Sequence, residues 1–205
     1  MLQNRVDPQG NIIATIARGA WMGNRGQLHD KGKDILRPYK LKAWLICLLE
    51  FRGRQRQVMS PNLYTELFFL DEATAFAAGH RPCFECRRKD YDRFKSLWLE
   101  GNPKYGFNFK TSVNEIDAII HEERIDKQGK KVTHQANINS LQTGTFVLFH
   151  DLPHLIANKQ LFPWSPFGYG EGVALPADSP ITVLTPVSLV NTLSAGYVPQ
   201  MGIDQ

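Results

Sequence analysis

The sequence predicts an α+β fold, in which a β-hairpin and helix zinc module of the treble-clef type is followed by a small mixed β unit with two helices. Three observations support this prediction. The pair Cys83-x-x-Cys86 stands directly before an amphipathic helical pattern. Cys47 lies within an apolar run that is typical of a strand. Beyond residue 131, short strand-like runs alternate with Pro and Gly.

Composition narrows the class of protein. The chain has 205 residues, of which 42% are hydrophobic and 11% aromatic, enough to bury a core. These fractions exclude disordered, collagen-like and coiled-coil classes. The apolar run from Ala43 to Leu49 is far shorter than the roughly 18 residues of a membrane helix, and the first eight residues lack the order of a secretory signal. We therefore expect a cytoplasmic protein that makes no membrane contact.

The N-terminal elements are expected to be mostly strands. A β-like run covers residues 11–17. The apolar run 43–51, a Gly-containing turn at 52–54 and the extended segment 55–60 together predict a β-hairpin. A third short buried strand is expected at 67–70.

Two helices should follow this third strand. Asp71 is placed as an N-cap, the alanine-rich segment 72–78 favours helix, and Gly79 supplies a left-handed stop. A second helix should start at Cys86. Its buried stripe would consist of Tyr91, Phe94, Leu97 and Trp98.

The C-terminal half should mix helices and strands. Ser112-x-x-Glu115 forms a capping box for a helix that runs to about residue 125. Thr185-Pro186 precedes a final helix over 187–195. Short strands are expected at 145–149, 155–157, 161–164 and 181–184. The break at Gly101-Asn102-Pro103 predicts two modules: a basic zinc-binding module over 1–102, and a mixed α+β module over 103–205 that packs on it.

The cysteines predict a zinc site. Cys83 and Cys86 are three positions apart in a tight turn before a helix, a spacing that lets two thiolates face one tetrahedral ion. Cys47, on the predicted hairpin, can supply a third thiolate. We expect His29 to be the fourth ligand, because it ends a Gly-rich loop close to the first strand. His80 is less suitable, because three ligands from one extended knuckle do not converge easily.

A family resemblance rests on the same region. The segments Phe68-Phe69-Leu70-Asp71-Glu72-Ala73 and Ala78-Gly79-His80-Arg81-Pro82-Cys83-x-x-Cys86 resemble the second half of the zinc-binding domain of Ada-type DNA alkylation-repair proteins. The resemblance implies a zinc fold and a role in DNA repair or processing. The family has a fourth cysteine where this chain has Phe51, which argues against the methyl-accepting reaction. The whole chain also resembles a bacterial protein family with Met22-Gly23-Asn24-Arg25-Gly26-x-Leu28-His29, which implies no particular reaction.

Basic residues suggest a polyanionic partner. Residues 1–60 hold 11 Lys and Arg against 4 Asp and Glu, whereas residues 105–205 hold 6 against 9. Such an asymmetry is typical of a surface that meets nucleic acid. Guanidinium groups suit phosphate oxygens, so the predicted contacts are Arg52, Arg54, Arg56, Arg87 and Arg88. The favoured function is a nucleic-acid-binding protein with a structural zinc ion.

An enzyme remains the alternative. Pro82-Cys83-x-x-Cys86 also matches half of the zinc nucleobase-deaminase signature, with Glu50 as its catalytic residue. Cys47 and Glu50 are three positions apart in a predicted strand, whereas that signature places the ligand and the carboxylate two apart on a helix. More generally, a metal-dependent hydrolase acting on nucleic acid or a nucleobase derivative would place His29, Glu66 or His150 beside an open metal position.

Overall fold

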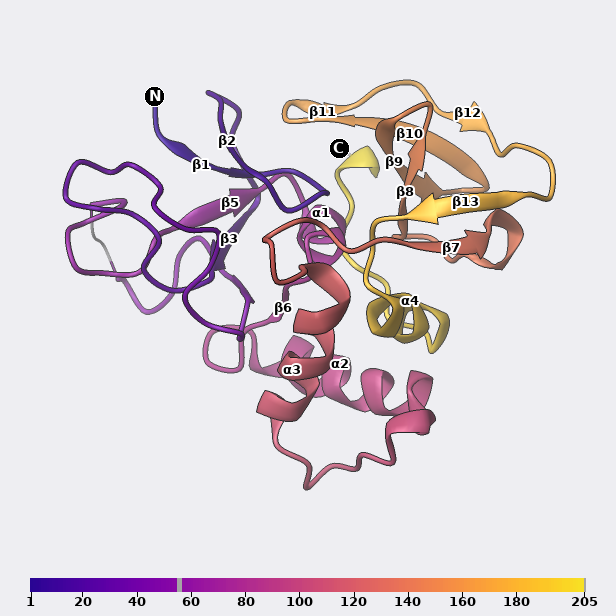
Figure 1. The fold of residues 1–205 in the computed structure, drawn as a ribbon, viewed down its shortest axis with the longest axis horizontal. Coiled ribbons are helices and arrows are strands. Elements are labelled where there is room, and N and C mark those ends of the chain that lie inside the picture. The colour runs from indigo at the N-terminus through magenta and orange to yellow at the C-terminus, as the bar shows by residue number, and fades with distance from the viewer. Residues whose placement is uncertain (55–56, 205) are drawn as a thin grey trace.

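A computed structural model describes residues 1–54 and 57–204, and it confirms the α+β class. Figure 1 shows two sheets on either side of the short helix α1, with α2, α3 and α4 grouped together below them. No helix among the described residues combines the length and the apolar composition needed to cross a membrane.

The first sheet is built from the N-terminal part of the chain. Its strands are β1 (Gln3–Val6), β2 (Ile12–Ala14), β3 (Trp21–Asn24), β4 (Leu45–Cys47), β5 (Leu67–Phe69) and β6 (Arg81–Pro82). They lie in the order β2-β1-β5-β3-β4-β6. The β1–β5 and β4–β6 pairs are parallel and the others are antiparallel.

The predicted hairpin around residues 43–60 is wrong. Strand β4 pairs with β3 on one side, with Met22 opposite Cys47, and with β6 on the other, with Ile46 opposite Pro82. The apolar run around β4 is thus buried between two neighbours that lie far away in the sequence. After it, residues 51–54 form a turn in which the Arg54 amide donates to the Phe51 carbonyl. The end of the expected second arm, residues 57–60, also forms a turn, and residues 55–56 lie outside the described range.

The second sheet is built from residues 134–183. Its strands are β7 (His134–Asn137), β8 (Phe146–Phe149), β9 (Leu152–Ala157), β10 (Gln160–Ser165), β11 (Gly168–Tyr169), β12 (Val173–Ala174) and β13 (Pro180–Val183). The order is β11-β10-β9-β8-β13-β7, and β12 pairs with β10. The two-residue turns His150–Asp151 and Asn158–Lys159 have positive φ at both positions, the geometry that suits tight hairpins.

The four helices lie close to their predicted positions: α1 (Glu72–Ala77), α2 (Arg88–Gly101), α3 (Val113–Arg124) and α4 (Val187–Ser194). Single 3-10 turns cover Pro103–Tyr105, Ile138–Ser140 and Gly202–Asp204. The Asp71 carboxylate accepts the Thr74 amide at 2.7 Å, and the Ser112 hydroxyl accepts the Asn114 amide at 3.3 Å. Both side chains therefore cap the helices that they were predicted to cap.

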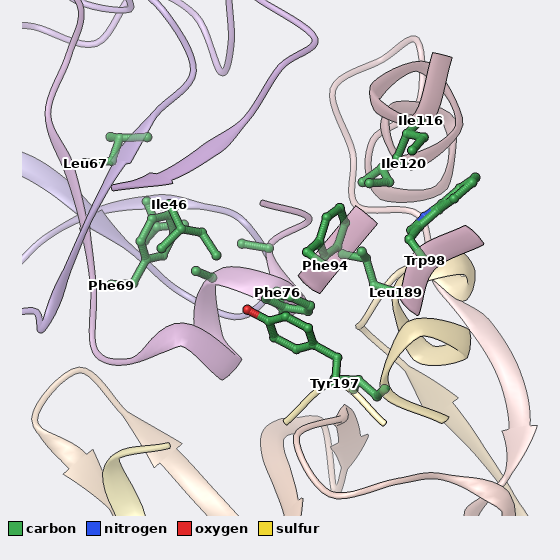
Figure 2. Close-up of a cluster of buried hydrophobic side chains, with 14 of the residues drawn as sticks. Ile46, Leu67, Phe69, Phe76, Phe94, Trp98, Ile116, Ile120, Leu189 and Tyr197 are labelled. Carbon is green, nitrogen blue, oxygen red and sulfur yellow. The ribbon is translucent and has the colours of Figure 1, made fainter. Parts of the chain in front are cut away.

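The main core draws on both halves of the chain. Figure 2 shows Phe76 of α1 between sheet residues such as Phe69 and the aromatic side chains Phe94 and Tyr197. The rings of Phe76 and Tyr197 are stacked with centroids 4.9 Å apart. Ile116, Ile120, Leu189 and Leu193 bring α3 and α4 into the same cluster. The division into 1–102 and 103–205 stays a prediction, and this core crosses it.

Candidate metal centre

The structure brings the three cysteines together. Their sulfur atoms all lie within 4.8 Å of one another. Cys47 ends β4 and Cys83 directly follows β6. Because these strands are parallel, and the Cys83 amide donates to the Ile46 carbonyl at 2.9 Å, the two cysteines leave the sheet side by side. Cys86 joins them from the turn that leads into α2.

Backbone amides point at the sulfur atoms. The Glu85 N–H donates to Cys83 Sγ at 3.4 Å, and the Cys86 N–H interacts with the same sulfur. The Leu48 N–H interacts in the same way with Cys86 Sγ. Such donors stabilise thiolates and withdraw negative charge from them, as outer-shell hydrogen bonds do at metal sites. The turns after both strands are thus shaped to hold thiolate sulfur.

The thiols are electrostatically unequal without a metal. A hydrogen bond from the Cys47 thiol, aided by the backbone amides, lowers the pKa of Cys83 to about 5. The Cys47 thiol likewise lowers the pKa of Cys86. Donating to both neighbours, together with burial, raises the pKa of Cys47 itself. A cation bound among the three sulfurs would replace that shared proton.

A cavity of about 330 Å³ adjoins this cysteine group, and all three cysteines line it. Its other walls include Phe51, Arg54, Tyr64, Glu66 and Phe68. Glu66 is buried, and its Oε2 accepts the Met59 amide at 2.8 Å. The cavity therefore combines a cluster of sulfur donors with a fixed carboxylate.

The donor set suits zinc. Three thiolates are soft ligands of the kind that select Zn²⁺ over Mg²⁺ or Ca²⁺. Within residues 1–54 and 57–204, the Cys, His, Asp and Glu ligand atoms of this group come from Cys47, Cys83 and Cys86 alone. A tetrahedral ion held by these three sulfurs would keep one position for a ligand from outside the group.

His29 does not join the cysteines, contrary to the prediction. Its Nδ1 lies 2.6 Å from the Thr65 hydroxyl and its Nε2 lies 3.3 Å from the Ser60 carbonyl. The Gly-rich loop folds back on itself, with a bridge between His29 and Ile35, so the imidazole is used to tie two loops together. His80 is buried elsewhere and accepts from Arg25 Nε at 3.1 Å.

Arg87 is a structural residue and not a surface contact. It is 5% exposed, and its guanidinium pairs with Glu72 at 2.7 Å and Asp90 at 2.8 Å. It also lies over the Trp21 ring, 4.0 Å from the centroid. Because α1 supplies a buried carboxylate opposite it, this arginine points inwards and is unavailable to nucleic acid.

The other predicted contact arginines differ in setting. Arg54 and Arg88 are exposed and pair with Glu85 and Asp92. Arg52 is exposed beside Phe51, with its guanidinium 4.9 Å from the ring centroid. Arg56 lies outside the described residues.

Comparisons with models of known protein families, with curated proteins and with solved structures find no match for this chain. The resemblance to Ada-type zinc domains therefore stays a prediction. The site is interpreted from its own residues.

The residues proposed for the enzyme alternative lie in different parts of the structure. Glu50 is exposed and does not line the cavity, so the deaminase signature built on it is wrong. His150 belongs to the turn between β8 and β9, in the other sheet. Glu66 alone of the proposed proton-transfer residues lies in the cavity with the cysteines. Its position just before buried β5 gave no local signal of this proximity, because Glu66 and the three cysteines line one cavity only in the folded chain.

Proposed function

We propose that the protein is a zinc-dependent hydrolytic enzyme, whose ion is held by Cys47, Cys83 and Cys86. One observation carries the proposal: the group of three thiols lines a cavity, and no fourth donor from the described residues closes it. Structural zinc sites use four protein ligands, whereas catalytic sites use three and leave one position open. The geometry favours the second type.

Glu66 is the residue that can move a proton in this cavity. Its carboxylate is held by the Met59 amide and lies outside the ligand group, as a general acid or base should. Zn²⁺ bound here would supply a Lewis acid for a substrate or a water molecule. Thiolates donate much negative charge, and the amides aimed at Cys83 and Cys86 offset part of that donation. A nucleobase derivative is one substrate class that suits such a site.

The proposal predicts one bound Zn²⁺ per chain, to be measured by elemental analysis of purified protein. Cys83→Ser should lose most of the ion, because it removes one of three ligands. In the Co²⁺-substituted protein, the visible ligand-field bands should shift when azide is added, because azide can occupy an open position. Bands that do not respond to azide would show a closed, structural site.

Glu66→Gln separates a proton-transfer role from metal binding. The variant should keep its zinc and the azide-dependent Co²⁺ spectrum, but lose at least about 100-fold of any hydrolytic turnover found by substrate screening. Glu85→Gln is the matched control, because this carboxylate also lines the cavity but is exposed and paired with Arg54. Equal turnover in both variants would remove Glu66 from the mechanism.

Nucleic-acid contact is a second candidate function. It is supported by the exposed basic residues Arg52, Arg54 and Arg88 next to the cysteine turns, and by the 52% exposed Phe84 between Cys83 and Cys86. The Arg88 guanidinium lies 4.0 Å from the Phe84 ring centroid, so cation and ring form one surface. Phosphates and unstacked bases are bound by such pairs. A role in DNA repair or processing would follow from the Ada resemblance.

Salt-dependent binding tests this second candidate. Affinity for a short single-stranded oligonucleotide should fall steeply with salt, and Arg52→Gln/Arg88→Gln should weaken it about ten-fold. Arg18→Gln/Lys110→Gln removes the same charge from exposed positions elsewhere and should have a smaller effect. Equal losses in the two double variants would show charge attraction without a defined surface.

A further inference from the structure

A second cavity, of about 390 Å³, is lined in part by Trp44. Its walls include Ile12, Leu36, Pro38, Trp44, Arg124 and Lys131, and it does not share a lining residue with the cysteine cavity. Arg37, exposed, stands at its rim. Both a cationic and an apolar surface are thus present in one cavity.

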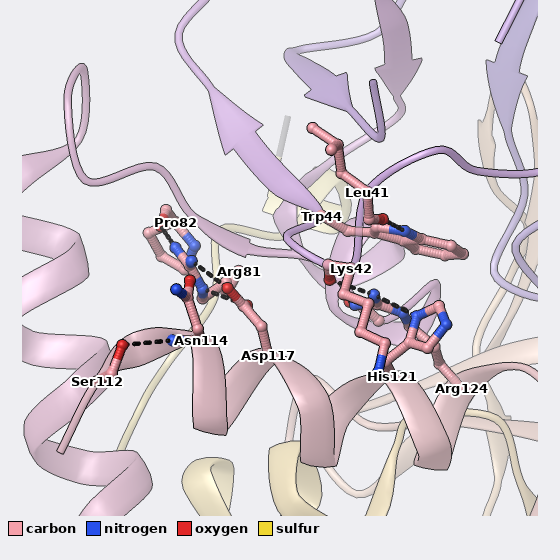
Figure 3. A network of polar contacts seen from close by, with 11 residues as sticks. Leu41, Lys42, Trp44, Arg81, Pro82, Ser112, Asn114, Asp117, His121 and Arg124 are labelled. Carbon is pink, nitrogen blue, oxygen red and sulfur yellow. Dashed lines mark hydrogen bonds and ion pairs between the residues drawn. The ribbon is translucent and has the colours of Figure 1, made fainter. Parts of the chain in front are cut away.

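Among the described residues, the hydrogen bonds of Arg124 and Lys131 go to neutral groups. Arg124 is 2% exposed, and its guanidinium donates to the carbonyls of Gly79 and Lys42 and contacts His121 Nδ1 at 2.8 Å (Figure 3). Its Nε has no hydrogen-bond partner among the described residues. Lys131 Nζ donates to the Ala77 carbonyl at 2.5 Å.

Arg25 adds a third charge directly behind this cavity. It is fully buried, and its Nη1 donates to the carbonyls of Gly10 and Pro38, both of which line the cavity. Its Nη2 has no hydrogen-bond partner among the described residues and lies 3.9 Å from where a Cβ on Gly10 would stand. The guanidiniums of Arg25 and Arg124 both lie over the Trp44 ring, at 3.9 and 3.8 Å from its centroid.

The local charge is not balanced by the protein. Asp7 is the carboxylate that interacts with Arg25 and Lys131, and its oxygens already accept from Asn11. Asp117 is engaged by Arg81 through two hydrogen bonds of 2.7 and 2.6 Å. Cations thus outnumber carboxylates around this cavity, because Asp7 is shared by Arg25 and Lys131, and Asp117, which also attracts Arg124, is already paired with Arg81.

Unpaired buried charges are costly unless a ligand neutralises them. Burial lowers the pKa of Arg25 to about 9, against the attraction of Asp7. Burial, with repulsion from Arg25 and Arg124, lowers the pKa of Lys131 to about 7. A phosphate monoester carries about −1.5 to −2 charges and several acceptor oxygens. The excess of cations matches that ligand, and the apolar walls leave room for an organic body.

We propose that this cavity binds a small phosphorylated molecule, with its phosphate group against Arg124 and Lys131. Arg37, an exposed residue of the lining, supplies a further cation to the ligand. The proposal does not depend on the metal centre, because the two cavities have separate walls.

Titration calorimetry with inorganic phosphate and with glycerol 3-phosphate tests the site, in chloride buffer of constant ionic strength. The wild-type protein should bind both saturably, and the ester should bind more tightly because it also contacts the apolar walls. Lys131→Met should raise both dissociation constants at least about ten-fold. The exposed Lys110→Met is the matched control and should change neither.

Lys131→Met also removes the hydrogen bond to Ala77, so a second variant guards against misfolding. Arg37→Gln is exposed and should keep the unfolding temperature of the wild-type protein, while weakening phosphate about three-fold. Absence of saturable binding of either probe to the wild-type protein would overturn the proposal. Unchanged affinity in both Lys131→Met and Arg37→Gln would overturn the assigned location.

Discussion

Arg81 illustrates how single residues join the two halves of the chain. It lies on β6, directly before the Cys83 turn, and its Nε and Nη2 both donate to the carboxylate of Asp117 of α3 (Figure 3). Both side chains are buried, with 5% and 2% of their area exposed. The pair fixes the strand that carries the cysteine turn against a helix from beyond residue 102.

Asp117→Ala should destabilise the protein by about 3–5 kcal/mol, because it leaves the Arg81 charge buried without a partner. Urea unfolding, followed by circular dichroism, measures the change. Asp92→Ala breaks the exposed Arg88 pair on α2 and should cost about 1 kcal/mol or less. Similar losses of unfolding free energy in the two variants would contradict the prediction that breaking the buried pair costs more than breaking the exposed pair.

Residue identity alone predicted only part of the site. Cys47, Cys83 and Cys86 were found because thiol chemistry and spacing are both visible in the sequence. The arginines were not separable in this way: Arg87 and Arg88 are neighbours, yet one is buried against Glu72 and the other is exposed. His29 failed for a similar reason, because Thr65 and Ser60, some 30 residues later, determine where its ring lies.

Helix α1 shows how much one element can depend on its N-cap residue. Asp71 caps the helix and also accepts the Tyr169 hydroxyl at 2.7 Å and the Gly202 amide at 2.9 Å. These donors come from the second sheet and from the C-terminal segment. The cap therefore ties two other parts of the chain to the helix between the sheets.

Asp71→Ala should cost roughly 3 kcal/mol of unfolding free energy, more than the ~1 kcal/mol of a simple cap, because it also strands a partly buried hydroxyl and an amide. Asp71→Ser keeps a capping oxygen and should recover part of this loss. Tyr169→Phe removes the hydroxyl itself and serves as the control. Denaturant titration measures the unfolding free energy lost in each of the three variants, and full recovery of the loss in Asp71→Ser would assign no role to the tertiary contacts.

Elements with local signals were predictable, and strand partners were not. As signals for the start or end of a helix, Asp71, Gly79 and Ser112 act on backbone groups within a few residues. Their helices therefore appear near the expected positions. The apolar run ending at Cys47 was correctly interpreted as a strand. Nothing within that run specifies its neighbours, and the structure pairs it with Trp21–Asn24 and Arg81–Pro82 in place of the segment that follows it.

In the folded molecule, cations outnumber carboxylates in the region around Trp44. The α+β class followed from patterns along the chain, but this region did not, because Arg25, Arg124 and Lys131 meet only after folding. Two histidines lie near cations of this region. Burial, with Arg25 and Arg124, lowers the pKa of His80 well below its usual value. Burial, with Arg124 and Lys42, lowers the pKa of His121 to about 4.

These histidines predict a protein that loses stability in mild acid. In the unfolded chain each imidazole takes up a proton near pH 6.5, while in the folded chain His121 stays neutral until about pH 4. The unfolded state then binds more protons, so the free energy of unfolding falls as the pH decreases through this window. One histidine contributes a slope of up to about 1.4 kcal/mol per pH unit.

His121→Gln should flatten this acid slope, because an amide does not titrate and its oxygen can still accept from the Arg124 guanidinium, which contacts His121 Nδ1 at 2.8 Å. Urea unfolding at pH 7, 6 and 5 gives the slope for each protein. Acid would also protonate the cysteines and release the proposed zinc ion, but it would do so in the wild-type protein and the variant alike, so the difference between their curves isolates the imidazole. Parallel curves over this range would mean that position 121 takes up its proton equally in the folded and unfolded chains.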